Sequence, residues 1–244
     1  MAPLVWLVTG CSSGFGAQFI TEILSRGDKA IATSRDPARL ASLADAGASV
    51  LQLDVTAPQA EIDAQMQKAV SVYGHIDVLI NNAGFVALGG VEETTQEELQ
   101  TQLATNLFGP INVTRALLPH FRSRRAGKVA FTSSIFSWYS QPCASPYAIS
   151  KHGLTAYAQT LALETASLGI QVTTFDIGHF RTKVGSPGNL KVYVPKIADY
   201  EDLKAQVEGM IGGVDGNQPG DPVKGVKVMV DVLTGEKKMP LRVP

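Results

Sequence analysis

Short apolar segments alternate along the chain with longer segments in which apolar residues recur at helical spacing. The short apolar segments predict β-strands over Leu4–Val8, Ala30–Thr33, Val50–Leu53, Val78–Asn81, Val129–Thr132, Gln171–Phe175 and Pro240–Val243. The segments between them predict α-helices over Gly16–Ser25, Ala38–Ala46, Pro58–Tyr73, Gln96–Phe121, Pro146–Leu168 and Pro222–Leu233. Strands and helices that alternate in this way predict an α/β fold, a doubly wound parallel sheet of about seven strands with helices on both faces.

The turn after the first predicted strand is rich in glycine and reads Thr9-Gly-Cys-Ser-Ser-Gly-Phe-Gly16. A strand, a glycine turn and a helix in this order can bind a pyrophosphate, because the backbone N–H groups approach it closely at the positive end of the helix. The glycine spacing differs from the common G-x-G-x-x-G fingerprint, and an ordinary glycine-rich turn is the alternative. The order of the three elements favours the nucleotide site, whose candidate residues are Gly10, Ser12, Ser13, Gly14, Phe15 and Gly16.

A phenol and an ammonium group stand four residues apart in Tyr147-Ala-Ile-Ser-Lys151. On a helix these positions share one face, so we expect Lys151 to lower the pKa of Tyr147 from its usual value of about 10. A tyrosine with a lowered pKa can act as a general acid or base. Alone, the pair is equally consistent with an exposed helix face, and it gains weight from the glycine turn upstream.

Composition excludes several classes of protein. The 244 residues suit one large α/β domain or two small ones, and no linker divides the chain; the net charge of −1 argues against binding to nucleic acid or an anionic membrane. Two cysteines are too few for a disulfide framework, and no apolar run approaches the roughly 18 residues of a membrane span. The N-terminal segment lacks a signal peptide's basic region, and no cluster of residues has metal-ligand spacing. We therefore expect a cytoplasmic protein without a metal.

Taken together, these residues resemble the short-chain dehydrogenase/reductase family over nearly the whole chain. The motifs that carry the resemblance, in order, are Thr9-Gly-x-x-x-Gly-x-Gly16, Asp54-Val55, Asn81-Asn82-Ala83-Gly84, Asn106, Ser134, Tyr147-x-x-x-Lys151 and Gly178…Thr182. The resemblance implies a single-domain Rossmann-type fold and an oxidoreductase that interconverts a ketone and a secondary alcohol. The segments Cys11–Gly16 and Ala32–Pro37 are most similar to members acting on steroids, retinoids and other bulky ketones or alcohols. A homo-oligomer, either a dimer or a tetramer, is compatible with the resemblance.

The resemblance also implies four catalytic residues, Asn106, Ser134, Tyr147 and Lys151. Tyr147 would protonate the carbonyl oxygen as hydride arrives, and Ser134 would hydrogen-bond the same oxygen. Lys151 would lower the pKa of Tyr147 and hold the nicotinamide ribose, while Asn106 would position a water in a proton relay. Ser133 competes with Ser134, and the family's thirteen-residue gap to the tyrosine selects Ser134. Taken alone, Asn106 fits a hydrogen-bonding residue between helices better than a catalytic residue.

The end of the second predicted strand bears on the choice between NADH and NADPH. Members that use NAD tend to carry an acidic residue there, whereas this chain has Ser34 followed by Arg35. A hydroxyl and a guanidinium can bind a 2′-phosphate through charge-assisted hydrogen bonds, so we expect NADPH. The alternative for Arg35 is a solvated loop cation, and Asp36 is expected to cap the next helix. Further cofactor residues implied by the resemblance are Asp54, Val55, Asn82, Ala83, Gly84, Tyr147, Lys151, Ile177, Gly178 and Thr182.

The substrate pocket is expected to be apolar and aromatic. Its candidate residues lie after the Asn-Asn-Ala-Gly turn, between Ser134 and Tyr147, and after the sixth strand; they are Phe85, Phe136, Trp138, Tyr139, Cys143 and Phe180. In the same segments, Val86, Leu88, Pro142 and Val184 are expected to complete the apolar walls. Walls of this kind suit an apolar ketone of several rings better than a sugar or a charged acid. His179 is expected to shape the pocket.

The stretch Lys183–Gly220 is the least regular part of the chain, with many glycines and prolines. It follows the sixth predicted strand at the carboxyl edge of the sheet, where folds of this kind bind ligands. We expect a flexible segment that covers the substrate, with hinges near Gly185 and Gly209–Gly213.

The alternative function is a non-redox isomerase or cyclase, or a nucleotide-sensing protein, on the same scaffold. Such proteins are expected to have lost Tyr147, Lys151 or Ser134, and this chain keeps all three. The enzyme is therefore the favoured reading.

Overall fold

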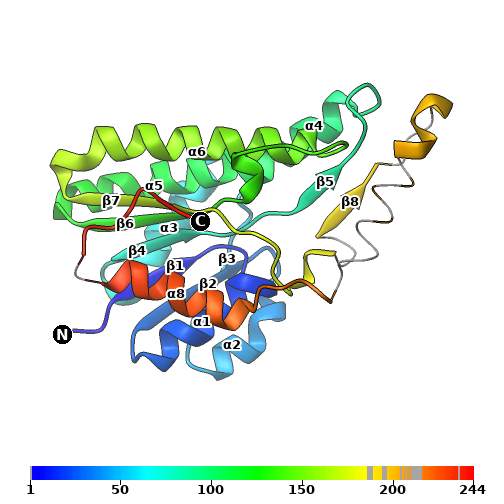
Figure 1. Ribbon diagram of the computed structural model, residues 1–244. Coiled ribbons are helices and arrows are strands. Elements are labelled where there is room, and N and C mark those ends of the chain that lie inside the picture. The colour runs from blue at the N-terminus through cyan, green and yellow to red at the C-terminus, as the bar shows by residue number, and fades with distance from the viewer. Residues whose placement is uncertain are drawn as a thin grey trace.

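The computed structural model describes residues 2–185, 189–193, 197–203, 205, 207, 209, 216–235 and 237–244. These residues form one domain with a central parallel sheet and helices on both faces (Figure 1). The sheet has the order β3-β2-β1-β4-β6-β7-β9, which confirms the predicted Rossmann-type fold. Its strands are β1 (Val5–Val8), β2 (Lys29–Ser34), β3 (Ser49–Gln52), β4 (Val78–Asn81), β6 (Gly127–Thr132), β7 (Ile170–Phe175) and β9 (Arg242–Val243).

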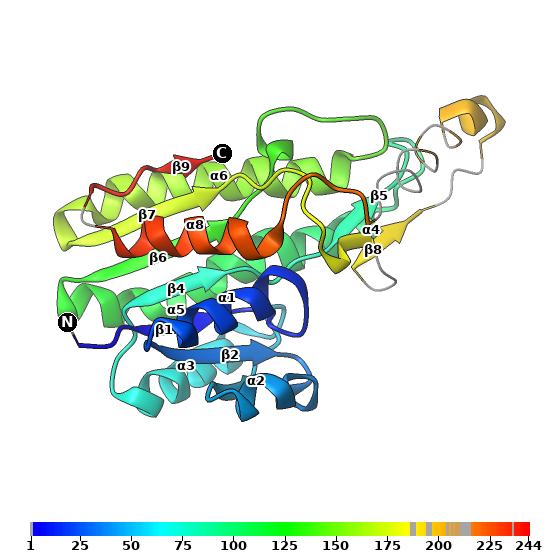
Figure 2. The same ribbon diagram turned by 60° about the horizontal axis from the view of Figure 1, so that its bottom comes forward.

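Two separate apolar clusters hold the helices on the sheet, one on each face. Leu7 of β1 belongs to the cluster that includes Phe121 of α5, whereas its neighbour Trp6 belongs to the cluster that includes Phe19 of α1 and Val230 of α8. Successive strand side chains point to opposite faces, so one strand serves both clusters. Figure 2 shows α1 and α8 side by side on one face. The described helices are α1 (Gly14–Ser25), α2 (Ala41–Asp45), α3 (Gln59–Tyr73), α4 (Gln96–Leu103), α5 (Gly109–Arg124), α6 (Ser145–Thr165) and α8 (Pro222–Thr234).

The predicted helix Gln96–Phe121 is wrong as a single element. The structure has α4, then a π-helix over Ala104–Phe108, and then α5. Pro110 lies at the start of α5 and has no N–H to donate to the carbonyl four residues earlier, which belongs to Asn106. The apolar periodicity continues through this break, so the pattern alone does not reveal it.

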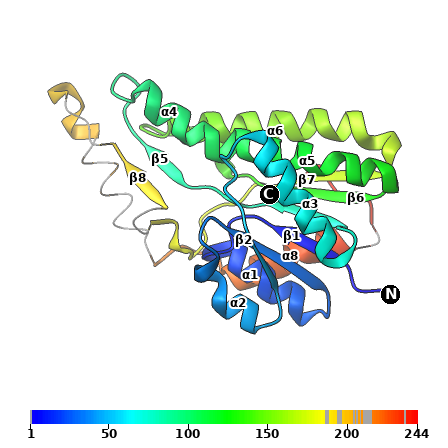
Figure 3. The same cartoon turned by 180° about the vertical axis from the view of Figure 1, so that it is seen from behind.

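A small second sheet was absent from the sequence prediction. β5 (Val86–Leu88) pairs in parallel with β8 (Leu190–Val192), and the pair projects beyond the carboxyl edge of the main sheet (Figure 1, Figure 3). The expectation that Lys183–Gly220 is irregular is therefore wrong for β8. Gly185 and Gly209 are described, whereas the rest of the second expected hinge, residues 210–213, lies outside the described residues. The flexible cover stays a prediction.

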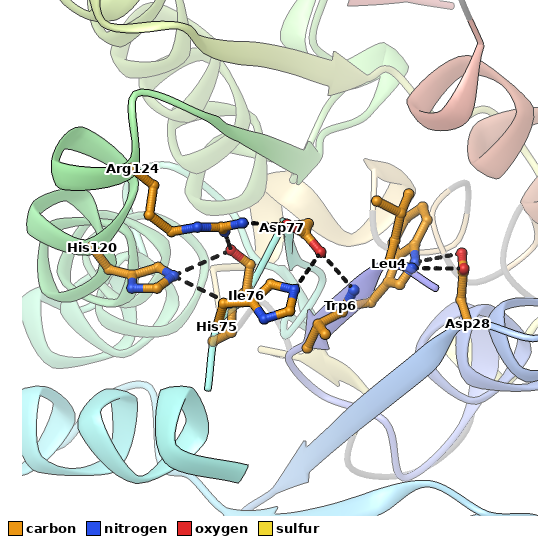
Figure 4. Close-up of polar contacts among 9 residues, drawn as sticks. Leu4, Trp6, Asp28, His75, Ile76, Asp77, His120 and Arg124 are labelled. Atoms are coloured by element: carbon orange, nitrogen blue, oxygen red, sulfur yellow. Dashed lines mark hydrogen bonds and ion pairs between the residues drawn. The ribbon is translucent and has the colours of Figure 1, made fainter. Parts of the chain in front are cut away.

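Charged side chains gather at the opposite, amino edge of the sheet (Figure 4). Asp77 accepts a hydrogen bond from the Val5 N–H at 2.9 Å, and its carboxylate lies 2.8 Å from the Arg124 guanidinium and 3.2 Å from the His75 ring. Burial alone raises the pKa of the Asp77 carboxyl, but these partners together hold that pKa below its usual value. The folded protein therefore favours the charged form of Asp77.

This cluster predicts a specific loss of stability in acid. Because the pKa of Asp77 is lowered on folding, its stabilising contribution is present above the unfolded pKa of about 4 and is lost as the pH falls through the folded value. Asp77→Asn should lower the free energy of unfolding at neutral pH by roughly 1–3 kcal/mol and flatten its fall below about pH 4. Urea denaturation between pH 2.5 and 7 measures both effects. The exposed Asp45→Asn is the control, and an acid limb that is equally steep in Asp77→Asn would contradict the prediction.

Candidate active site

A cavity of about 1080 Å³ lies at the carboxyl edge of the main sheet. Its lining includes the four predicted catalytic residues and every predicted cofactor residue except Gly16. A Cβ atom on Gly16 would stand 2.3 Å from the Gly10 carbonyl oxygen. Gly16 therefore allows the glycine turn to close on itself and does not face the cavity.

The glycine turn has the shape of an anion cradle. Gly10 has a φ of 71°, and a Cβ atom on it would lie 2.7 Å from the Cα of Ala83. Only glycine therefore fits between the turn and the segment after β4. Within the described chain, Ser13 at the start of α1 makes no side-chain capping bond, so the first N–H groups of the helix remain available to an anion. These features fit a pyrophosphate.

Thr9 and Asn82 tie the two halves of this cradle together. The Thr9 hydroxyl accepts hydrogen bonds from the N–H groups of Asn82 at 2.9 Å and Ala83 at 3.0 Å. The Asn82 side-chain amide in return donates to the carbonyls of Thr9 at 2.9 Å and Gly10 at 3.1 Å. Asn82 therefore fixes the shape of the turn with its side chain.

Three candidate catalytic groups meet on the other side of the cavity. Tyr147 and Lys151 lie on α6, and Ser134 follows β6 and hydrogen-bonds the Tyr147 hydroxyl. The Lys151 Nζ donates to the Thr132 carbonyl at 2.7 Å and lies 5.5 Å from the centre of the Tyr147 ring. The predicted i, i+4 geometry therefore brings the ammonium group beside the phenol.

The protonation of this pair differs from the sequence prediction. Burial raises the pKa of Tyr147 above its usual value, and the hydrogen bond from Ser134 opposes that shift only in part. The expectation that Lys151 lowers the Tyr147 pKa toward neutrality is wrong here, because burial of the phenol raises that pKa. Burial also lowers the pKa of Lys151 to about 8. At neutral pH Tyr147 is a protonated acid beside a lysine that is mostly charged.

The Asn106 side chain makes two hydrogen bonds to the main chain of Phe85. Its Oδ1 accepts the Phe85 N–H at 3.1 Å, and its Nδ2 donates to the Phe85 carbonyl at 2.8 Å. One turn earlier, the Gln102 Oε1 accepts the Ala87 N–H at 2.7 Å. The side chain of Asn106 thus holds the segment that leads into β5. Pro110 has no N–H, so it donates no hydrogen bond to the Asn106 carbonyl.

Two arginines, four residues apart in the sequence, lie at the end of the cavity beside β2. Arg35 and Arg39 both line the cavity, and within the described ranges neither guanidinium makes an ion pair. Asp36 accepts the Ala38 N–H at 3.1 Å, which confirms its predicted capping role. The Ser34 hydroxyl donates to the Asp36 carbonyl at 2.9 Å. Sequence reasoning missed Arg39, which lies in the short helical turn Pro37–Leu40 that follows Arg35.

Three of the six candidate substrate residues do not line the cavity. Phe85, Phe136 and Phe180 line it, whereas Trp138, Tyr139 and Cys143 do not. The Trp138 indole N–H donates to the Asp176 carboxylate at 2.9 Å, and Tyr139 stacks on Phe136 at 5.5 Å between ring centres. The Cys143 carbonyl accepts the Gly89 N–H at 2.6 Å, and its side chain is buried. Through these contacts the three residues hold neighbouring parts of the protein together.

Part of the apolar wall of the cavity comes from β5 and β8. The expected wall residues Val86, Leu88, Pro142 and Val184 line the cavity, and so do Leu190 of β8 and Val207, which the sequence analysis did not propose. Val86 and Leu88 meet Leu190 because β5 pairs with β8, two strands far apart in sequence. No local pattern announces such a pairing, which is why Leu190 was missed.

Three further features of the described residues concern metal ligands, membrane-spanning helices and the reactivity of a thiol. Among the described residues, no set of three or more His, Cys, Asp or Glu side chains could hold a metal ion. Likewise, no described helix is long and apolar enough to cross a membrane. Burial raises the pKa of the Cys11 thiol to about 12, so this cysteine in the glycine turn is not a nucleophile.

Comparisons with known proteins indicate the family of the chain. A family model for short chain dehydrogenases matches residues 4–191. An uncharacterised oxidoreductase of Bacillus subtilis, YusZ, is 32% identical over 254 residues, which cover 100% of this chain and 89% of YusZ. A 3-ketodihydrosphingosine reductase of Bacteroides thetaiotaomicron is 34% identical over 202 residues, which cover 83% of this chain and 73% of that protein. The structure of a short-chain dehydrogenase from Streptomyces avermitilis is 36% identical with a TM-score of 0.89, over 99% of this chain and 87% of that one.

The buried lysine predicts how stability changes with pH. Because the pKa of Lys151 falls to about 8 on folding, the unfolded chain holds this proton between about pH 8 and 10.5 while the folded protein has lost it. Stability should therefore rise with pH over this window, by roughly 3 kcal/mol from this group. Lys151→Met should remove that part of the rise in urea denaturation, whereas the exposed Lys68→Met should not. If the free energy of unfolding varies with pH in parallel for wild type and Lys151→Met, Lys151 has the same pKa in the folded and unfolded states and the prediction is wrong.

Proposed function

The chain belongs to the short-chain dehydrogenase family, and we propose that it is an NADPH-dependent oxidoreductase that interconverts a ketone and a secondary alcohol on a bulky apolar molecule. The observation that carries this proposal is the meeting of Tyr147, Ser134 and Lys151 in the same cavity as the glycine cradle. An acid, a hydrogen-bond donor and a cation beside an anion cradle are the groups that carbonyl reduction needs.

The residues of the chain divide the work on the carbonyl group. A bound nicotinamide supplies the hydride that adds to the carbonyl carbon. Tyr147 gives its proton to the carbonyl oxygen, and Ser134 donates a hydrogen bond to the same oxygen and steadies its growing negative charge. The positive charge of Lys151 stabilises the Tyr147 phenolate that remains after this transfer. A water bound at the Asn106 carbonyl then returns a proton to the phenolate. Protonated Tyr147 at neutral pH suits the direction of reduction.

The preference for NADPH rests on Ser34, Arg35 and Arg39. Two guanidinium groups without a carboxylate partner in the described structure can bind a 2′-phosphate bidentately. Asp36 lines the same end, but its carboxylate is turned to the Ala38 N–H. The balance of charge at this end therefore favours a dianionic group.

The apolar walls and one relative support the proposed substrate class. Val86, Leu88 and Leu190 face the cavity together with Phe136, and burying such surface favours an apolar substrate. The similarity to a 3-ketodihydrosphingosine reductase supports an apolar ketone. A cytoplasmic location and a dimeric or tetrameric assembly stay predictions.

The chemistry is tested by Tyr147→Phe. This change removes only the acidic proton, so NADPH should bind nearly as before while ketone reduction falls by roughly 10²–10⁴-fold. NADPH absorbance is followed with a panel of apolar ketones of one to four rings. Tyr157→Phe, the same change on α6 beside Phe131, is the matched control and should keep its activity. Turnover by Tyr147→Phe at the wild-type rate would refute the mechanism.

The cofactor preference is tested by Arg35→Ala and Arg39→Ala. Each loses a charge-assisted hydrogen bond worth about 1.5–3 kcal/mol, so the Kd for NADPH should rise on the order of ten- to a hundredfold. The Kd for NADH should stay nearly unchanged, because NADH has no 2′-phosphate. Arg122→Ala, at an exposed position on α5, controls for net charge. Wild-type protein that binds both cofactors equally would overturn the assignment.

A further inference from the structure

The short strand β9 brings Arg242 to the loop that carries Ser134. β9 lies beside β7 at the edge of the sheet (Figure 2). The Thr174 N–H donates to the Leu241 carbonyl at 2.9 Å, and the Asp176 N–H donates to the Val243 carbonyl at 2.7 Å. The main chain on both sides of Arg242 is therefore fixed to β7 and its end.

The Arg242 guanidinium contacts three residues at once. Its Nε donates to the Asp176 Oδ2 at 2.8 Å, its Nη2 donates to the Ser137 hydroxyl at 2.7 Å, and its central carbon lies 3.6 Å from the centre of the Trp138 ring. The Asp176 side chain is 0% exposed and that of Arg242 is 19% exposed. Burying an ion pair costs desolvation energy that its attraction rarely exceeds, so stability alone gives little reason for this arrangement.

The hydrogen bonds continue from Arg242 to Ser134. The Ser137 hydroxyl accepts from Arg242 and donates its one proton to the Ser134 carbonyl at 2.6 Å. The Ser137 N–H donates to the same carbonyl at 2.8 Å. The Asp176 Oδ1 lies farther from the Ser137 hydroxyl, at 3.4 Å, so the short bond to Ser134 holds the proton. This gives one directed chain of donors from Arg242 through Ser137 to Ser134.

The turn held by this chain presents two cavity residues. The Ser134 hydroxyl, which accepts the Phe136 N–H at 3.2 Å, also bonds Tyr147. Phe136 lies edge-on to the Tyr147 ring at 5.5 Å between ring centres. A shift of the Ser134 carbonyl would therefore move the hydroxyl against the phenol, and a misplacement of about 1 Å can cost on the order of a hundredfold in rate.

We propose that Arg242 is a positioning residue that sets the Ser134 hydroxyl against Tyr147 by way of Ser137. It does not touch the substrate and acts through the turn 134–138 alone. This inference rests on the proposed function, in which Ser134 hydrogen-bonds the carbonyl oxygen. The proposed role does not involve the glycine cradle, Arg35 or Arg39.

A double-mutant cycle tests the proposal on the ketone of the panel that the wild-type protein reduces fastest. Arg242→Met should lower kcat roughly ten- to a hundredfold and leave the Kd for NADPH unchanged. In a Ser134→Ala background the same substitution should change kcat only slightly, because the hydroxyl that Arg242 positions is already gone. Equal losses in the two backgrounds would show a merely structural role and overturn the proposal.

A second variant covers poor folding of Arg242→Met. Ser137→Ala leaves the Arg242–Asp176 ion pair in place and removes only the bridging hydroxyl, so it should reproduce the loss in kcat. Wild-type turnover by Ser137→Ala would also overturn the proposal. Arg124→Met breaks another Arg–Asp pair, at the opposite edge of the sheet, and should lower stability without changing kcat.

A titration separates this proposal from the proposed function. The bond from Ser134 lowers the pKa of Tyr147, so a displaced Ser134 should raise it. Ultraviolet difference titration, with Tyr147→Phe as the blank, should show a higher Tyr147 pKa in Arg242→Met and Ser137→Ala, but no further rise when either is combined with Ser134→Ala. This readout needs no ketone. An unchanged Tyr147 pKa would defeat the positioning role even if ketone reduction is demonstrated.

Discussion

The close contact between the turn after β1 and the turn after β4 is the constraint on which the rest of the site depends. β1 pairs with β2 on one side and β4 on the other, so the chain leaves the two central strands in opposite directions, and this is where sheets of this kind open a ligand crevice. Gly10 permits the contact, and the hydrogen bonds between Thr9 and Asn82 hold it. With these turns in place, the cradle on α1 and the acid on α6 face one cavity.

The sequence predicts those parts of the fold whose cause is local. The β4 bounds Val78–Asn81 match the prediction, because a buried parallel strand is an unbroken apolar run. The break at Ala104–Phe108 was missed because one proline matters more there than apolar spacing. β8 was missed because its partner lies about a hundred residues away. Trp138 was misplaced because its partner Arg242 comes from the far end of the chain, a contact that no neighbouring residue signals.

The candidate catalytic groups were easier to predict than their protonation. Spacing on a helix shows that Lys151 lies near Tyr147, but it says nothing of how deeply the two are buried. Burial acts on both groups in the direction of the neutral form, raising the pKa of Tyr147 and lowering that of Lys151 to about 8. The structure thus keeps a costly lysine inside the protein, and burial of this kind is expected where function and not stability selects the residue.

The buried polar side chains around the cavity share one physical logic, in which each binds main-chain groups of a neighbouring segment. Asn82 braces the glycine turn, Asn106 holds the main chain at Phe85, and Lys151 holds the carbonyl of Thr132. Because these bonds fix backbone, the side chains that β5 and β8 turn toward the cavity are free to differ without disturbing the acid and its partners. In the proposed function, substrate choice and chemistry can therefore change separately: the apolar wall would contact the substrate, while the hydrogen-bonded main chain holds Tyr147 and its partners in place.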